Sequence, residues 1–447
     1  MKSNTDIKYI STKQMKVHIV GAGPTGMSIA WELKKYTDHD VVVYDKKSSA
    51  GGSWWEPSVD SRDLHAHRIV FDRAFINTNS LFEEMGIAWD AIFQKAESSS
   101  GPVISKYLSA RDYVTLSSLA VKVLAMPWKY KKMSLKDAIG TLSENGQKLM
   151  EAVTLVIDGV PWDVMTAYEF VKSFDHVGLS KAYTQKVSGK VMCDAMQAAL
   201  VDRGVQFKFE TELQDVVYRE GGFTAQFDDG EVIEDGLLVL CLDNSPAMKF
   251  VKDNWGENAI DKIESSTYGA INVILEYDEE ITIASDLQYI IDSELHIQPV
   301  VLSDKKTISC VICDLTNEIL HMEEDILIKK VIEQLGIRKP KKVRIGWGAE
   351  WGGDKWTFDQ SSGVLNPNGH IPFFGNSETV AMCGMMSYRK TPYSSIEAAV
   401  EVGRSFCNQR FGTRKPSTPF MVTDVLLLFI VLLITALNRK RIYKLFK

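Results

Sequence analysis

Residues 16–57 read KVHIVGAGPTGMSIAWELKKYTDHDVVVYDKKSSAGGSWWEP. The run Val17–Val20 is mostly apolar, which predicts a buried parallel strand. Three glycines follow, apolar residues then recur at helical spacing, and a second apolar run, Val41–Tyr44, predicts another buried strand. The stretch therefore predicts a strand, a tight turn, a helix and a second strand, which is the first unit of a parallel α/β sheet.

The glycines between the first strand and the helix predict dinucleotide binding. Gly21, Gly23 and Gly26 have G-x-G-x-x-G spacing. The first glycine permits the turn, the second lets the backbone approach a pyrophosphate, and the third lets the helix pack closely on the strand. Pro24 and Thr25 open the helix, whose N-terminus faces the negative charge of the cofactor.

The second strand ends in an acid. Asp45 lies about 20 residues after the last glycine, where a carboxylate can accept hydrogen bonds from a ribose. A carboxylate at this place would repel a 2′-phosphate. We assign Lys46 to the same binding region, although Lys46 and Lys47 also fit solvated loop charges.

A glycine pair then distinguishes flavin from nicotinamide. Gly51, Gly52, Ser53 and Trp54 follow the second strand, and paired glycines leave main-chain N–H groups uncovered for an anionic ligand. Here the sequence resembles the FAD-binding amine oxidase superfamily, with its relatives the phytoene-desaturase-like enzymes and flavin monooxygenases. The resemblance implies FAD, whereas a flexible loop remains the alternative for this segment.

The composition is that of an ordinary globular protein. Of 447 residues, 45% are hydrophobic and 24% charged, which suits two or three domains or one large two-lobed flavoenzyme. The formal net charge of -7 gives no indication of nucleic-acid binding. Six scattered cysteines predict a reducing, cytoplasmic compartment, and Cys310 and Cys313 point to opposite faces of a strand, so no metal site is expected.

The two ends of the chain differ. Residues 1–14 lack the apolar core of a secretory signal. Residues 419–437 read PFMVTDVLLLFIVLLITAL, and a basic tail follows. As a helix this span would be roughly 28 Å long, enough to cross the hydrocarbon core of a membrane. The sequence predicts a single C-terminal transmembrane helix of undetermined orientation, reached through the short linker at 416–419; a buried helix is the alternative.

The resemblance also implies how the chain is divided. It implies a Rossmann-like FAD-binding domain of the glutathione-reductase type, interleaved with an α+β substrate domain. The FAD-binding segments would be residues 15–75, 187–250 and 371–412, the substrate-domain segments residues 76–186 and 251–370, and the transmembrane helix residues 419–437.

Further cofactor contacts follow from the same resemblance. Arg68, with His65 and His67, would lie near the cofactor cavity, and the strand around Val216 would pass the adenine. In the last FAD segment, an EAAVEVG helix at 397–403 would point its N-terminus at the flavin. Its surroundings supply the remaining candidates: Gly384, Met385, Ser394, Ser395 and Ile396 as cofactor-binding residues, Tyr393 facing the flavin, and Arg389 approaching a phosphate.

The substrate side is less clearly defined. Residues 347–356, WGAEWGGDKW, resemble the aromatic segment of the family's substrate cage, so that Trp347, Trp351 and Tyr393 are candidate catalytic residues and Glu350 could pair with a cation. The segment also fits a tryptophan-rich packing loop. The sequence differs from the family's pattern at two places. Met385 stands where the family usually has an acidic residue, and the strand at 271–277, on which family oxidases often have a lysine, has Asn272 and no lysine.

These features predict a membrane-anchored, FAD-dependent, amine oxidase-like oxidoreductase. Flavin N5 would take a hydride from a C–H bond of a small-molecule or lipid substrate held between aromatic rings. Two alternatives remain open: a membrane-associated desaturase or isomerase acting on a lipid or polyene, and a flavoprotein scaffold without catalysis.

Overall fold

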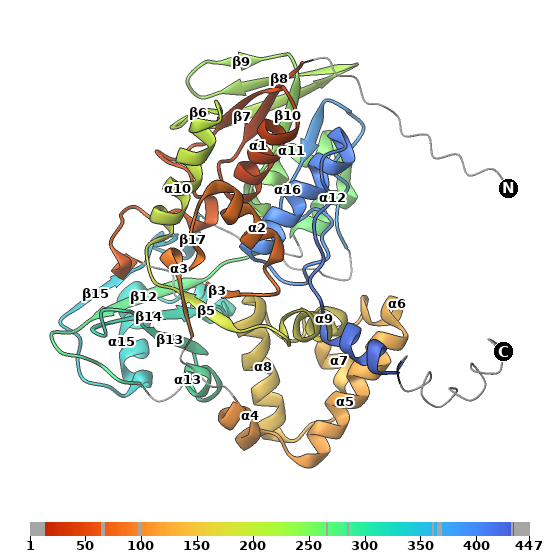
Figure 1. The fold of residues 1–447 in the computed structure, drawn as a ribbon. Helices are drawn as coiled ribbons and strands as arrows, with labels where there is room; N and C mark the ends of the chain where they lie inside the picture. Colours follow the sequence, from red (N-terminus) through yellow and green to blue (C-terminus); the bar gives the residue numbers. More distant parts are fainter. Residues whose placement is uncertain are drawn as a thin grey trace, which may run out of the picture.

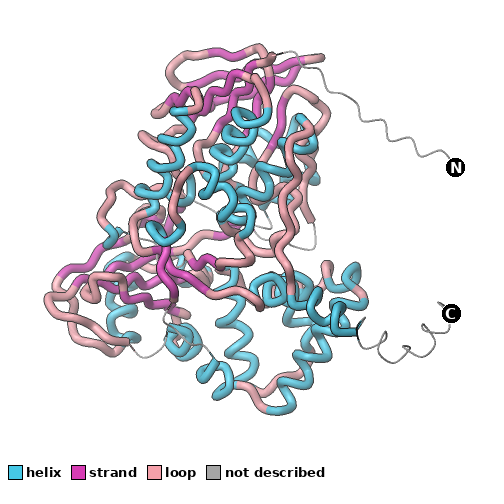
Figure 2. The backbone as a smooth tube through the Cα atoms, in the orientation of Figure 1, coloured by secondary structure: helices cyan, strands magenta, loops and turns pink. Residues whose placement is uncertain are grey.

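The computed structural model describes residues 14–63, 68–96, 101–264, 267–283, 286–359, 362–363, 369–430 and 432. They form two lobes joined by a narrow middle layer, and the chain crosses between the lobes several times (Figure 1). The first lobe contains the first strand and helix of the described chain together with α16 (Ile396–Phe411), and the second lobe contains most of the other helices (Figure 2).

A five-stranded parallel sheet is the centre of the first lobe. Its strand order is β19 (Val380–Met382), β10 (Leu237–Leu240), β1 (Lys16–Val20), β2 (Asp40–Tyr44) and β6 (Gln206–Lys208). Each neighbouring pair is parallel, with Ile19 opposite both Val43 and Val239. β1, β2, β10 and β19 are mostly apolar because both faces of the sheet are covered, whereas the edge strand β6 is partly polar. The predicted α/β, Rossmann-like fold is confirmed.

Helices and an antiparallel meander complete this lobe. Helices α1 (Pro24–Tyr36) and α16 (Ile396–Phe411) pack on each other, and α10 (Gly189–Asp202) lies against α1. The other elements are the antiparallel meander β7 (Leu213–Arg219), β8 (Gly222–Phe227) and β9 (Val232–Ile233), with α2 (Ile76–Met85), α11 (Asn244–Trp255) and α12 (Glu257–Glu264).

The second lobe has a helical part and a sheet part. The helical part consists of α4 (Gly101–Tyr107), α5 (Ala110–Ala125), α6 (Pro127–Tyr130), α7 (Leu135–Ile139), α8 (Glu144–Asp158) and α9 (Ala167–Val177). The sheet has the order β13 (Ile297–Val301), β14 (Thr307–Ile312), β12 (Ile271–Glu276) and β15 (Lys342–Ile345), and α13 (Asp286–Asp292), α14 (Asn317–Leu320) and α15 (Glu324–Leu335) accompany it.

Short elements fill the region between the lobes. They are the sheet β3 (Ile69–Phe71), β5 (Ala182–Gln185) and β4 (Phe93–Lys95) with α3 (Trp89–Ile92), the pairs β11 (Thr267–Tyr268) with β18 (Ser362–Gly363) and β16 (Ala349–Trp351) with β17 (Trp356–Phe358), and two 3₁₀ turns at Gly52–Trp54 and Ser61–Asp63.

The C-terminal segment differs from the prediction. Among the residues that the structure describes, no helix is long and apolar enough to cross a membrane. Of the predicted span 419–437, residue 431 and residues 433–437 lie outside the described part. The segment at 416–419 is not a free linker, because Ser417 N donates to Asn77 Oδ1 at 2.8 Å and Ser417 O accepts from Asn77 Nδ2 at 2.9 Å.

Candidate functional site

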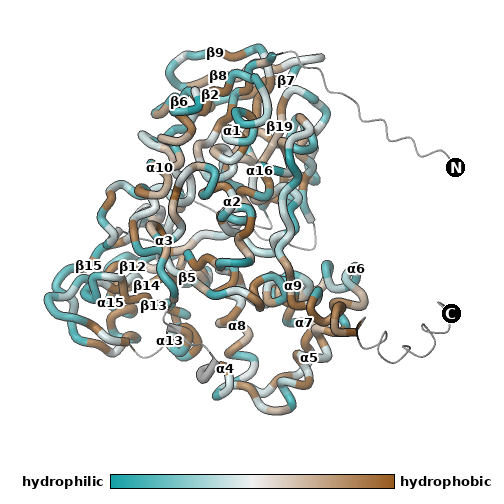
Figure 3. The backbone as a smooth tube through the Cα atoms, viewed as in Figure 1, coloured by the Kyte–Doolittle hydropathy of each residue, from teal (hydrophilic) through white to brown (hydrophobic). Residues whose placement is uncertain are grey.

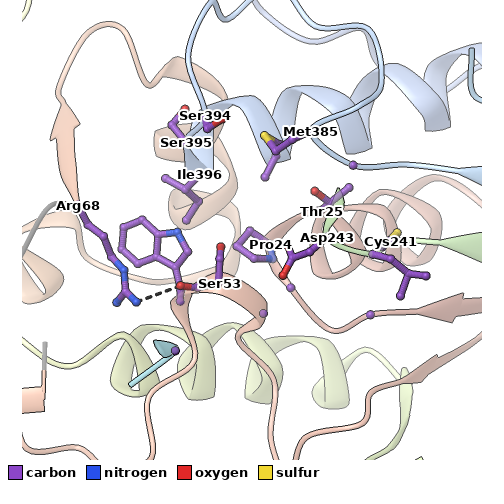
Figure 4. Close-up of a pocket in the computed structure, with 18 of the residues that line it drawn as sticks. Pro24, Thr25, Ser53, Arg68, Cys241, Asp243, Met385, Ser394, Ser395 and Ile396 are labelled. Atoms are coloured by element: carbon purple, nitrogen blue, oxygen red, sulfur yellow. Dashed lines mark hydrogen bonds between the residues drawn. The ribbon is translucent and has the colours of Figure 1, made fainter. Parts of the chain in front are cut away.

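A cavity of about 470 Å³ runs from the first lobe into the second. It begins at the carboxyl ends of β1, β2, β10 and β19, where ligands of open parallel sheets bind. It ends against α8, α9 and the segment before β12. Figure 4 shows the first-lobe part, with Ser53 and Arg68 on one side and Cys241 and Asp243 on the other.

The predicted glycines shape this cavity in two ways. Gly21 has φ +107°, and a Cβ there would lie 2.1 Å from the Cys241 carbonyl oxygen. A Cβ at Gly26 would lie 2.0 Å from Gly21 O, so Gly26 serves helix packing and does not line the cavity. Gly23 and Gly52 line it facing each other, with 3.4 Å from a Cβ on Gly23 to Gly52 Cα. Gly51, at φ +150°, does not line the cavity, and a Cβ there would lie 2.7 Å from Trp55 Cα.

Asp45 lies at the cavity wall and is tied to the main chain. Its Oδ2 accepts from Ala22 N at 2.7 Å and its Oδ1 from Lys47 N at 2.9 Å. Burial raises the pKa of this carboxyl, and the two backbone N–H groups oppose that shift. Pro24, Thr25 and the exposed Lys46 also line the cavity.

The interpretation of Lys47 as a solvated loop charge is wrong. Its Nζ is buried between two indole rings, 4.9 Å from the centre of Trp55 and 4.6 Å from that of Trp347. It has no hydrogen-bond partner among the described residues. Burial lowers its pKa. An ammonium buried in this way beside the Asp45 carboxylate is a donor suited to a ribose or base.

Arg68 and Trp54 form the opposite wall. The guanidinium lies 4.9 Å from the centre of the Trp54 ring, and Arg68 Nη2 donates to Ser53 O at 3.0 Å, as Figure 4 shows. Arg68 also forms an ion pair with Glu56, whose side chain is 1% exposed and which accepts from Ser188 Oγ at 2.7 Å. Sequence reasoning missed Glu56, because nothing near it in the chain indicates a partner. His65 and His67 lie outside the described residues.

The start of α16 closes the far wall. Ser395 caps the helix by accepting from Ala398 N at 3.2 Å, and Ser394 N donates to Asp158 Oδ1 at 2.8 Å. Ile396 lines the cavity with both serines, and so do Gly384 and Met385 from the loop after β19. Arg389 does not line the cavity; it is 4% exposed and donates to Met385 O.

Tyr393 faces the cavity in a fixed orientation. Its hydroxyl is 2.7 Å from His176 Nδ1, and its ring stacks on Phe75 with 6.2 Å between centroids. Burial lowers the pKa of His176 to about 4, so the imidazole is neutral at physiological pH. Burial also raises the pKa of Tyr393. The pair therefore positions a neutral phenol.

The second-lobe end of the cavity is apolar. Its walls are mostly apolar side chains, with Ser173 and Cys313 among them: Ile69, Phe71, Phe75, Val156, Ile157, Phe174, Val177, Tyr268, Ala270 and Tyr393. Asp158 is the one carboxyl among the described residues that line this end, and sequence reasoning missed it. Burial raises the pKa of Asp158 to about 7, while Arg389 and Ser394 oppose the shift.

Several residues predicted from the sequence to contact substrate or cofactor lie in other places than expected. Trp347 covers Lys47 and Trp55 beside Asp45, while Trp351 packs on Trp356 and does not line the cavity. Glu350 lines a second cavity of about 360 Å³. Val216 is buried in the meander, and Thr211, Glu212 and Leu213 line the cavity instead.

The strand that carries a lysine in the family supplies none here. Asn272 is 2% exposed, bonds to Ser309 Oγ at 2.8 Å and does not line the cavity. The lysines among the described lining residues are Lys46, Lys47 and Lys249, which come from the first lobe. No group of three or more potential metal ligands occurs in the described part of the chain.

Comparisons with known proteins agree with this geometry. Residues 142–335 match the family model of the flavin containing amine oxidoreductases, and residues 19–82 match that of the NAD(P)-binding Rossmann-like domain. A segment of 55 residues is 42% identical to "Flavin-containing monooxygenase FMO GS-OX-like 8" of Arabidopsis thaliana. That segment covers 12% of this chain and 12% of the relative.

Solved structures show the same fold over most of the chain. Putrescine oxidase bound to putrescine has a TM-score of 0.66 at 14% identity, covering 90% of this chain and 99% of that one. An oxidoreductase from Methanosarcina mazei has a TM-score of 0.60 at 13% identity, covering 88% of this chain and 100% of that one. A candidate protoporphyrinogen oxidase from Exiguobacterium sp. 255-15 has a TM-score of 0.58 at 12% identity, covering 89% and 99%.

The glycine cradle of Gly23 and Gly52 and the buried ammonium of Lys47 fit the pyrophosphate and ribose of FAD. The matches to the two family models support the flavin-containing amine oxidase superfamily for this chain, and with it an FAD-dependent oxidoreductase.

Proposed function

We propose that this protein oxidises a C–H bond of a substrate held at the apolar, second-lobe end of its cavity. The observation that carries the proposal is the change in lining along one cavity, from glycines, Asp45 and Lys47 to aromatic and aliphatic side chains. FAD, when bound, supplies the hydride acceptor. Aromatic walls hold and desolvate the substrate, and the capped N-terminus of α16 supplies positive potential.

Within this class we favour an amine with an apolar body. The apolar walls would bury the body, and the carboxylate of Asp158 would attract the cationic end. A lipid or polyene is the second candidate, and it is favoured by the lack of any other carboxyl among the described lining residues of this end. The third candidate is a flavoprotein that binds FAD without catalysis. It is supported by the strand around Asn272, which has no lysine where the family's oxidases often have one.

An absorption spectrum tests these alternatives. We expect the purified full chain to show oxidised-flavin bands that bleach when an apolar amine is added without oxygen. Bleaching by an apolar lipid or polyene and by no amine would replace the amine proposal with the desaturase or isomerase. Bands that no donor bleaches would leave the scaffold.

The charge state of Asp158 predicts a pH dependence. Because burial raises its pKa to about 7, the carboxyl is neutral below that pH and negative above it. We expect the KM for a cationic amine to fall as pH rises through about 7, and the KM of Asp158→Asn to show no such step. The free energy of unfolding should change in the unfavourable direction over the same pH range. The raised pKa of Asp158 contributes its full stability below about pH 4, and this contribution is lost as the pH rises to about 7. The exposed Asp163→Asn is the matched control. An unchanged pH profile in Asp158→Asn would remove Asp158 from the substrate site.

We also propose that residues 419–437 anchor the chain in a membrane and that its globular part lies in a reducing, cytoplasmic compartment. In support, the described residues 425–430 and 432 are exposed apolar side chains, among them Phe429 at 64% and Leu427 at 61%. All six cysteines are unpaired. Flotation of the full chain with vesicles, and its loss on deletion of residues 425–447, is the expected result.

A further inference from the structure

The segment between α16 and the C-terminal apolar residues is held along its length. Arg414 pairs with Glu32 at 3.0 Å and with Glu84 at 2.5 Å in the first lobe. Thr423 N then donates to Asp175 Oδ1 at 2.8 Å on α9 of the second lobe. We call residues 413–424 the strap. Because both of its ends are bonded to folded elements, the apolar residues that follow it leave the protein at one fixed place, beside α9 (Figure 3).

An exposed aromatic and basic surface adjoins that place. We define the docking face as Trp128, Lys131, Tyr388, Lys390 and Phe420. The three aromatic side chains are 69%, 62% and 60% exposed, and both lysines are exposed. Exposed rings of this size together with lysines are typical of side chains at the level of lipid headgroups.

Two side-chain contacts connect the docking face to the strap and to α9. Lys390 Nζ donates to Thr418 Oγ1 in the strap at 3.3 Å. Lys131 Nζ lies 4.7 Å from the centre of the Tyr168 ring on α9. In Figure 1, α6 and the helix at 422–430, which begins at the end of the strap, lie on the same side of the second lobe.

A residue that lines the cavity is exposed at the same place. Phe174 on α9 lines the cavity, yet 48% of its surface is exposed. One helical turn further on, a Cβ at Gly178 would lie 2.6 Å from Val422 Cγ2, so the strap packs directly against this turn. The apolar end of the cavity therefore lies next to the point where the apolar C-terminal residues begin.

We propose that the docking face lies on the surface of a lipid bilayer, oriented by the strap, so that a substrate dissolved in the bilayer enters the cavity past Phe174. The proposal rests on the membrane anchoring proposed above, and it adds an orientation that an anchor on a free linker would not impose. The lysines of the face and the basic residues after position 437 would favour anionic lipid.

Lipid quenching of a site-specific probe tests the orientation. The full chain would carry Trp128→Cys or Phe420→Cys labelled with an environment-sensitive fluorophore, and Val232→Cys, 53% exposed on β9 of the other lobe, as matched control. Labelling of the unsubstituted chain gives the background from the native cysteines. On vesicles of phosphatidylcholine with phosphatidylserine, we expect nitroxide-labelled lipid to quench the probes at 128 and 420 and not the probe at 232.

A charge substitution gives a second measurement. The double variant Trp128→Glu with Phe420→Glu should partition onto the same vesicles roughly tenfold more weakly than Val232→Glu, because two apolar rings leave the headgroup region. Vesicle binding with equal quenching at 128 and 232 would overturn the docking face while leaving the anchor. Absence of binding by the full chain would overturn both, and the flavin spectrum would still report the oxidoreductase separately.

Discussion

Replacing Gly23 with valine is expected to lower the affinity for FAD by roughly 100-fold, which corresponds to about 2.7 kcal/mol. Gly23 has φ −75° and ψ 177°, an extended conformation that valine adopts without strain. A Cβ there would lie 3.4 Å from Gly52 Cα, which is ordinary contact. The two methyl groups of valine, however, would occupy the space between the facing glycines, through which the pyrophosphate is expected to run.

The measurement is flavin retention after desalting, followed by titration of the apoprotein with FAD and thermal unfolding. Gly222→Val is the matched control: it lies in the same lobe, at the start of β8, its φ is not in the left-handed region, and no atom lies within 4 Å of its Cβ position. We expect the control to keep FAD and both variants to unfold near the parent temperature. A Gly23→Val protein that retains flavin normally would show that the cofactor does not pass between Gly23 and Gly52.

The contrast between predicted and missed residues has a physical basis. The sequence alone predicts the cofactor glycines because they meet local requirements of the backbone: Gly21 must adopt φ +107° within the strand–turn–helix unit of residues 16–36. The Ser395 cap and the end of α2 at Gly86, φ +74°, follow from equally local rules. Such features need no knowledge of the rest of the chain.

Residues that act through distant partners were not visible. Asp158 receives its hydrogen bond from Ser394, 236 positions away, and Glu56 receives bonds from residues about 130 positions away. Trp347 was assigned to the substrate because aromatic residues suit a cage, yet the structure places it over Lys47. A tryptophan is equally suited to either place, and only the contacts of Trp347 with Lys47 and Trp55 in the folded chain decide between them.

The difference between local sequence rules and distant contacts also explains which features of the C-terminal segment the sequence predicts. The sequence at 416–419, PSTP, has the composition of a linker, and nothing in it predicts that Ser417 bonds to Asn77 across 340 positions. The apolar run after it is unmistakable in the sequence. Composition therefore identified the apolar segment, whereas its attachment to both lobes depends on tertiary contacts.

Arg68→Met is expected to destabilise the protein by about 3 kcal/mol, the lower end of the cost of breaking a buried ion pair. The Arg68 and Glu56 side chains are 11% and 1% exposed, so removal of the guanidinium leaves a carboxylate in a site with little solvent. Arg68 also covers Trp54 and bonds to Ser53 O, so we expect weaker FAD binding in addition. The measurement is the urea midpoint of the apoprotein, with FAD titration of the folded variant.

The matched control is Arg219→Met, whose partner Glu234 is 58% exposed and whose own side chain is 59% exposed. An exposed pair of this kind contributes about 0–1 kcal/mol, so the control should unfold close to the parent. The double variant Arg68→Met with Glu56→Gln separates charge from packing. If the cost of the single variant comes from the buried carboxylate, neutralising Glu56 should recover at least half of it. If the double variant is no more stable than Arg68→Met, the loss comes from the contacts of the guanidinium with Trp54 and Ser53, and the ion pair itself contributes little to holding this wall of the FAD site.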